Sequence, residues 1–385
     1  MTICAVVLLG TLCQIANVGS RMAVSLLAIG EGVPTVLIGS LLALFSLPPM
    51  LFALFGGRMI DRVGIRAPLI GATGAMTTVL LLAALVPQVW FLFLFAAVVG
   101  LAQNLTSLAL LTAIGSMGVP EDRTANMSWL SLGYSSGLFV GPVLTGYLIE
   151  WVGQRPTFAV LALFPGAALG FIWLLNAGAM RSGAAGQRRF HPKQILELLR
   201  HPKLRGALIA GVIVSGGWDM FSFVMPVHGA AIGLSASAIG IIIGAYGLAS
   251  ASVRAMLPLF HRQMPEWTLL AAAMLISGTL FLVFPFVAAP AALTVLAFLL
   301  GLALGGAQPT AVAIVLRYAP VERRGEVIGV RSSMMNAVHT SMPLVFGALG
   351  SALGMAPLFL VVAGVLFLGG YRSKTHWGRG EAGEA

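Results

Sequence analysis

One face of the first apolar stretch carries three polar side chains that could bind a ligand or a proton. Gln14, Asn17 and Arg21 follow one another at intervals of three and four residues, so they share one side of a helix. Lipid cannot satisfy such a stripe. It therefore predicts either the wall of a polar cavity or a hydrogen-bond network between helices, and we favour the cavity.

Asp219 is the only acidic residue placed deep within an apolar stretch. A carboxyl group in that position can take up and release a proton, and an ionisable residue inside a membrane indicates a functional site. His339 could also exchange a proton, or act only as a hydrogen-bond donor. Further candidate cavity residues are Gln103, Asn104, Trp218 and Asn336, with core packing as the alternative for the tryptophan.

Other kinds of chemistry find no support in the sequence. It contains no nucleophile elbow, no His-Glu-x-x-His and no phosphate-binding glycine loop followed by lysine, so we expect neither an enzyme nor an ATP-driven pump. Cys4 and Cys13 match no metal-ligand spacing, and we expect no metal and no cofactor. The net charge of +10 does not indicate nucleic acid, because the arginines gather at the ends of apolar stretches.

The elements that must position these residues are membrane helices. Of the 385 residues 58% are hydrophobic and only 9% are charged, against about 25% charged in soluble domains. A membrane-spanning helix needs about 20 apolar residues. Twelve such stretches can be placed, at 3–29, 34–56, 68–87, 89–116, 126–151, 156–176, 204–228, 235–259, 267–288, 290–316, 326–350 and 353–371. The expected fold class is an all-α integral membrane protein with twelve transmembrane helices.

The distribution of basic residues predicts the orientation. Arg155 alone falls on one side of the membrane, and Arg21, Arg254 and Arg331 lie within spans. All other lysines and arginines fall on the opposite side. The positive-inside rule then places both chain termini in the cytoplasm. We expect a multi-pass protein of the cytoplasmic (inner) membrane.

The two halves of the chain resemble copies offset by about 200 residues, as in duplicated transporter folds. Gly39 matches Gly240, Pro142 matches Pro343 and Arg62 matches Arg262. We therefore expect two pseudo-symmetric six-helix bundles. The predicted units are bundles at 1–176 and 204–371, a cytoplasmic linker at 177–203 with a short amphipathic helix at 192–200, and a tail at 372–385.

The polar segment from Gly57 to Arg66 separates the second and third stretches, where a helical hairpin would turn. Its residues Gly57, Asp61, Arg62, Gly64 and Arg66 resemble motif A, the cytoplasmic loop signature of the major facilitator superfamily; Ile65 departs from it. The resemblance implies a latch that holds the cytoplasmic side closed. A positively charged loop with a helix cap is the alternative.

A second segment, in the fifth stretch, resembles motif C of the drug:proton antiporter branch of that family. Gly137, Gly141, Pro142 and Gly146 match it, and Thr145 departs from a usual glycine. Small residues at this spacing also occur in ordinary helix packing. The arginine that drug antiporters usually carry near the start of the fourth span is replaced by Ala96. The resemblance therefore favours efflux but leaves proton coupling to other charged groups.

In this family the first and seventh spans face each other, so the resemblance implies that Arg21 and Asp219 approach one another when the outer side closes. Opening that pair could couple protonation to alternating access, and a static salt bridge is the alternative. Three in-span arginines against one aspartate indicate an electropositive cavity, which favours an organic anion or a neutral amphiphile.

The function expected from the sequence is a secondary active transporter that moves a small organic molecule by alternating access. We expect proton coupling, the efflux direction and a monomer in the lipid bilayer. A proton symporter that imports an organic anion is the alternative. A membrane sensor without transport activity is a more remote one.

Overall fold

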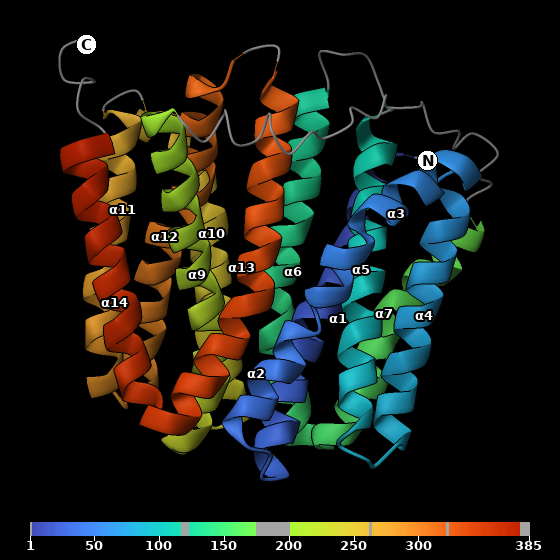
Figure 1. Ribbon diagram of the computed structural model, residues 1–385. Coiled ribbons are helices and arrows are strands. Elements are labelled where there is room, and N and C mark those ends of the chain that lie inside the picture. The colour runs from blue at the N-terminus through green and yellow to red at the C-terminus, as the bar shows by residue number, and fades with distance from the viewer. Residues whose placement is uncertain are drawn as a thin grey trace.

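The computed structural model describes residues 2–115, 117, 123–174, 201–261, 264–320 and 323–377, which form helices and no strands. The helices lie roughly side by side, and α1 begins at the same end of the molecule at which α14 ends (Figure 1). We call this end the near end and the opposite one the far end. The expected helix at 192–200, the rest of the linker from 177 to 200 and Arg262 lie outside the described residues, whereas residues 202 and 203 of the expected linker begin a helix.

The helices of the first half are α1 (Ile3–Gly30), α2 (Thr35–Ala43), α3 (Leu47–Val63), α4 (Arg66–Leu85), α5 (Phe91–Gly115), α6 (Arg123–Val152) and α7 (Gln154–Leu174). Those of the second half are α9 (Pro202–Ala231), α10 (Ala236–His261), α11 (Glu266–Val283), α12 (Pro290–Tyr318), α13 (Arg324–Leu353) and α14 (Met355–Arg372). The 3₁₀ turn η2 (Phe284–Phe286) follows α11, and the π-helical turn η4 (Ser373–Trp377) follows α14.

Eleven of the described helical segments are long and apolar enough to cross a membrane, so the chain is a multi-pass membrane protein. The expected stretch at 326–350, which is part of α13, is not among them. Its helix has 30 residues, but it carries Arg331, Asn336 and His339. The all-helical fold is therefore confirmed, whereas the count of twelve spans stays a prediction.

The stretch expected as one helix at 34–56 is instead broken between α2 and α3. Pro48 and Pro49 cause the break, because proline lacks a backbone N–H and its ring clashes with the preceding turn of a helix. Proline is tolerated at a helix start, and these two residues lie in the first turn of α3. The break leaves Phe45 and Ser46 between the two helices, close to α1.

The segment from Gly57 to Arg66 is also not the loop that its composition suggested. Helix α3 continues through Gly57 and Asp61 to Val63, and α4 begins at Arg66. The turn is confined to Gly64 and Ile65. Gly64 has a φ of 79°, which glycine adopts without strain, and its N–H donates to the carbonyl of Ile60 at 2.9 Å.

Two seams join the halves of the chain towards the far end. In one, α2 packs on α13, and a Cβ added at Gly39 would collide with the carbonyl oxygen of Pro343. In the other, α6 packs on α10, and a Cβ at Gly240 would collide with the carbonyl oxygen of Pro142. The two contacts involve matched residues, because Gly240 follows Gly39 by about 200 residues and Pro343 follows Pro142 by the same offset. These two contacts agree with the expected repeat, and the arrangement as two pseudo-symmetric six-helix bundles stays a prediction.

Further contacts extend the α6–α10 seam. Gly146 lies against the backbone of Ala236 and Ser237, where α10 begins. The N–H of Ser237 donates to a carboxylate oxygen of Glu150 at 2.8 Å, so the last part of α6 caps α10. Close backbone approach and this cap hold the two halves together at the far end.

Helix α1 packs along a second face of α6. A Cβ at Gly137 would meet Gln14 at 2.7 Å, and one at Gly141 would meet the carbonyl oxygen of Ile15 at 2.8 Å. Small residues let the two backbones approach at this spacing, which is the usual way in which membrane helices associate. This packing places the polar face of α1 towards the interior of the molecule.

We expect Gly240→Val to lower the stability of the folded protein by about 1–3 kcal/mol, because the new side chain has no room beside Pro142. Gly71→Val is the matched control, since nothing lies within 4 Å of its Cβ position. Thermal unfolding in a neutral detergent measures both variants. Equal melting temperatures for the two would show that the seam is not tightly packed.

Candidate functional site

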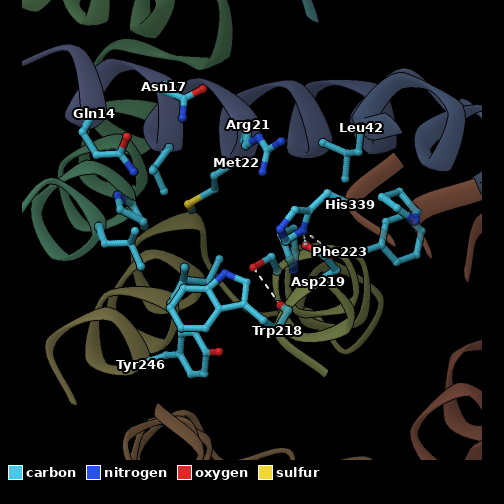
Figure 2. A pocket seen from close by; sticks show the side chains of 17 residues that line it. Gln14, Asn17, Arg21, Met22, Leu42, Trp218, Asp219, Phe223, Tyr246 and His339 are labelled. Carbon is cyan, nitrogen blue, oxygen red and sulfur yellow. Dashed lines mark hydrogen bonds and ion pairs between the residues drawn. The ribbon is translucent and has the colours of Figure 1, made fainter. Parts of the chain in front are cut away.

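A cavity of about 190 Å³ lies between the two halves, lined mainly by α1, α6, α9, α10 and α13. Figure 2 shows its side chains converging from these helices. The lining residues are Gln14, Asn17, Val18, Arg21, Met22, Leu42, Leu138, Pro142, Trp218, Asp219, Ser222, Phe223, Pro226, Ile243, Tyr246, His339 and Pro343. Six of the nine expected cavity residues are among them.

Asp219 and His339 form an ion pair in this cavity if the histidine is protonated. The Nδ1 atom of His339 lies 2.7 Å from one carboxylate oxygen of Asp219 and 2.9 Å from the other. Asp219 is only 9% exposed. An ionised carboxylate accepts a hydrogen bond from Nδ1–H, whereas a protonated carboxyl group donates one to a neutral Nδ1, so the hydrogen bond can form with the shared proton on either partner. The contact thus joins a carboxyl group and an imidazole directly in the wall of the cavity.

Among the described residues no hydrogen bond or ion pair joins Arg21 to Asp219, and the approach of the two when the outer side closes stays a prediction. The Nη2 of Arg21 donates to the hydroxyl of Ser46 at 3.3 Å, and its guanidinium lies 5.0 Å from the centre of the Phe45 ring. Both partners come from the break between α2 and α3, which the sequence reasoning missed. Among the described residues, His339 takes the place at the carboxylate that was assigned to Arg21.

Arg21 nevertheless retains capacity for a ligand. Its Nε atom is buried and makes no hydrogen bond to any described residue. A buried N–H without a partner is costly, and a ligand oxygen would satisfy it. In Figure 2 the side chain of Arg21 extends from α1 towards His339 and Asp219. The cavity therefore offers one unsatisfied cationic donor beside the Asp219–His339 pair.

The other expected polar residues lie at different distances from the cavity. Gln14 and Asn17 line it, whereas Gln103 stands behind Gln14 and donates to its side-chain oxygen at 2.8 Å. Asn104 and Asn336 are not among the lining residues. Gln103 thus acts on the cavity through Gln14, and the sequence spacing alone could not separate the two roles.

An aromatic wall closes one side of the cavity. Trp218 lies edge-on to Tyr246 with ring centres 4.7 Å apart, and Phe221 stacks on Tyr246 at 4.5 Å. The hydroxyl of Tyr246 is buried and has no hydrogen-bond partner among the described residues. The sequence reasoning missed Tyr246, although a tyrosine in the middle of an apolar stretch is a signal of a polar interior.

The charges in the cavity are more nearly balanced than the sequence suggested. Arg331 donates to the side-chain oxygen of Gln308 at 2.9 Å and does not line the cavity, and Arg254 lies in a separate groove. Gln308 in turn donates to Ser215 at 2.6 Å. Only Arg21 among the three in-span arginines reaches the cavity. The cavity thus holds one arginine, one aspartate and one histidine among its described lining residues, and the expected electropositive character stays a prediction.

The gating segment lies away from this cavity. Arg62 is exposed near the end of α3, and Arg66 begins α4 with a buried Nε that has no partner among the described residues. The side chain of Asp61 lies outside the described part of the structure. Within the described residues, no group of three or more His, Cys, Asp and Glu is placed to hold a metal ion.

Comparisons with known proteins agree with this architecture. The family model described as Major Facilitator Superfamily matches residues 7–293 and 265–373. The Multidrug resistance protein MdtG of Dickeya zeae (strain Ech586) is 26% identical over 331 residues, which cover 83% of this chain and 79% of that protein. The protein of the same name from Citrobacter koseri (strain ATCC BAA-895 / CDC 4225-83 / SGSC4696) is 27% identical over 322 residues, with 81% and 78% covered.

Solved structures share the fold at much lower identity. A POT family transporter in complex with 5-aminolevulinic acid superposes with a TM-score of 0.78 at 11% identity, covering 96% of this chain and 94% of that one. A point mutant of the nucleoside transporter NupG gives a TM-score of 0.79 at 12% identity, covering 97% and 99%. These likenesses establish the arrangement of the helices.

Proposed function

The chain belongs to the major facilitator superfamily, a family of transporters rather than enzymes, and on that premise we propose that it is a proton-coupled exporter of a small organic molecule. The observation that carries the proposal is the Asp219–His339 pair in a cavity between the two halves. Because the pair lies in the cavity, a proton bound to it can either favour or oppose the binding of cargo in the same space. The multidrug resistance relatives favour the outward direction.

The proposed orientation places the near end, with both termini, in the cytoplasm. Support comes from the basic residues, because Arg155 is the only one placed on the other side. Its guanidinium bonds to Glu31 and to the carbonyls of Val86 and Pro87, which lie in connections at the far end. The far end then lies on the outer side of the membrane. Because two tight seams close that end, the arrangement is the one in which the cavity opens towards the cytoplasm.

In the proposed transport cycle the two halves are six-helix bundles, at 1–176 and 204–371, that rock about the cavity. The linker at 177–203 and the tail at 372–385 lie in the cytoplasm, and α13 is the twelfth span. The segment from Gly57 to Arg66 would hold the cytoplasmic side closed in the opposite arrangement. The protein would work as a monomer in the cytoplasmic (inner) membrane.

The proposed cargo is a neutral amphiphile or an organic anion. The aromatic wall of Trp218 and Tyr246 suits a planar apolar group, and the unpartnered Nε of Arg21 suits an oxygen atom of the cargo. The near balance of charge favours the neutral compound over the anion. Import of an organic anion together with protons is the second candidate, which Arg21 supports.

Proton coupling is proposed to run through the Asp219–His339 pair. Adding one proton to the pair changes the charge beside Arg21 by one, so cargo affinity must differ between the two protonation states. Arg21 would act by its field and by its free donor rather than as a salt-bridge partner. The pair would take up a proton when the cavity is open to one side of the membrane and release it when the cavity is open to the other. This proton movement would drive the movement of cargo.

Flux in proteoliposomes that contain only this protein tests the proposal. We impose a proton gradient across the membrane and expect radiolabelled chloramphenicol, a neutral amphiphile, to move in the direction opposite to the protons. Salicylate, an organic anion, should move more slowly. Accumulation of salicylate together with protons would instead support the importer. Absence of any gradient-dependent flux for neutral, anionic and cationic probes would contradict a proton-coupled transporter and favour the sensor.

A further inference from the structure

A second cavity, of about 410 Å³, lies between α6 and α10 on the near side of their seam. Its lining residues are Ser128, Trp129, Ser131, Leu132 and Ser135 on α6, and Ala251 and Arg254 on α10. None of them lines the central cavity. We call this space the α6–α10 groove.

The groove exists because the two helices part. Towards the far end their backbones touch, with Gly240 against Pro142, Gly244 against Phe139 and Gly247 against Leu138. Helical spacing continues the same faces towards the near end, through Ser135 and Ser131 on α6 and through Ala251 and Arg254 on α10. The glycines that allow close contact end at Gly247, and beyond that point the two faces enclose the groove.

The chemistry of the groove suits an anion. The guanidinium of Arg254 carries five N–H donors, and none of the described residues forms an ion pair with it. Serine hydroxyls on one face of α6 add further donors opposite it. No described acidic residue lines the groove. A phosphate or carboxylate group would therefore find several donors and no repulsion.

The surroundings of the groove suit a lipid rather than a soluble anion. Trp129 is 56% exposed, Leu132 is 52% exposed and Met256, on α10 beyond the groove, is 47% exposed. Exposed apolar side chains beside a cationic group are typical of the boundary between headgroups and hydrocarbon, where tryptophan gathers. Arg254 also stands roughly 10 Å before the end of α10, at 1.5 Å per residue, which suits the headgroup side of that boundary.

We propose that the α6–α10 groove binds the phosphodiester headgroup of an anionic phospholipid from the near leaflet. Arg254 and the serine face hold the phosphate, and Trp129 and Leu132 contact the upper acyl chain. The bound lipid occupies the space that α6 and α10 would have to close if the near end shut. It therefore stabilises the arrangement in which the far end is closed.

Native mass spectrometry of the full chain, in neutral detergent with equal amounts of phosphatidylglycerol and phosphatidylcholine, tests the proposal. We expect the wild-type protein to retain phosphatidylglycerol preferentially and Arg254→Gln to lose about tenfold of that preference, the effect of one lost charge-assisted hydrogen bond. Arg254→Lys should keep most of it. Arg372→Gln, an exposed basic residue at the end of α14, is the matched control and should bind as the wild type does.

Three results would overturn the proposal. Equal preference in the wild type and Arg254→Gln would show that the groove does not bind the headgroup. Displacement of the lipid by sn-glycerol 1-phosphate at equal concentration would show that the site takes a free anion instead. Because loss of Arg254 could also disturb folding, Ser131→Leu provides a second variant that fills the groove and keeps the charge. It should lose the lipid as well, and normal retention would count against the site.

Discussion

Replacing Asp219 with asparagine is expected to abolish proton-driven transport while cargo exchange between the two sides continues. Asparagine has the same shape and can still bond to Nδ1 of His339, but it cannot ionise, so the cavity loses its proton-dependent charge. We expect concentrative flux to fall by roughly 100-fold, near the upper range of coupling between two sites. Uptake into proteoliposomes with and without a proton gradient measures the driven flux.

Counterflow of labelled against unlabelled cargo serves as the internal control, because it needs binding and movement but no gradient. Glu31→Gln is the matched carboxylate control, since Glu31 pairs with Arg155 at the far end and lies outside the cavity. It should transport as the wild type does. If Asp219→Asn showed the same concentrative flux as the wild type, the carboxylate of Asp219 would have no part in proton coupling.

Replacing Arg21 with glutamine is expected to weaken cargo binding by roughly 10–100-fold, because the cavity loses the one arginine among its described lining residues and the buried Nε donor. Lysine should restore little. Its ammonium keeps the charge but lacks the planar guanidinium that lies over Phe45 and the separate Nε donor. Ligand-induced thermal shifts give the dissociation constants for chloramphenicol and salicylate.

Arg331→Gln separates binding from folding in that experiment. Arg331 also lies within the bundle, yet it bonds to Gln308 and does not line the cavity. We expect this control to lower the melting temperature of the free protein without changing the dissociation constants. If Arg21→Gln bound both probes as tightly as the wild type, Arg21 would have only a structural role at Ser46 and Phe45.

Much of the fold follows from the sequence because the bilayer restricts the possibilities. Hydrophobic length predicted the helices, and the repeat paired Gly39 with Gly240, although it did not show that each of them packs against the other half of the chain. The break at Pro48 was predictable in principle, since two adjacent prolines cannot continue a helix. The polar composition of Gly57 to Arg66 was misleading, because most of the segment remains in α3.

The partners of the charged residues could not be derived in the same way. Helical spacing put Arg21 on the interior face of α1, but whether it meets Asp219 depends on the tilt of α1 against α9 and on the break that brings Ser46 close. His339 reaches Asp219 from a helix 120 residues further along the chain. Distances of this kind come from packing between helices, which periodicity within one helix does not encode.

In the proposed mechanism protons and cargo move in opposite directions, and the site at Asp219 couples the two movements. The most direct test is the pH inside proteoliposomes, followed with a trapped pH-sensitive dye, while a chloramphenicol gradient alone is imposed. For the wild-type protein we predict a cargo-driven pH change that is absent in Asp219→Asn. Cargo movement by the wild type with no change in internal pH, or an equal change in the variant, would contradict the account.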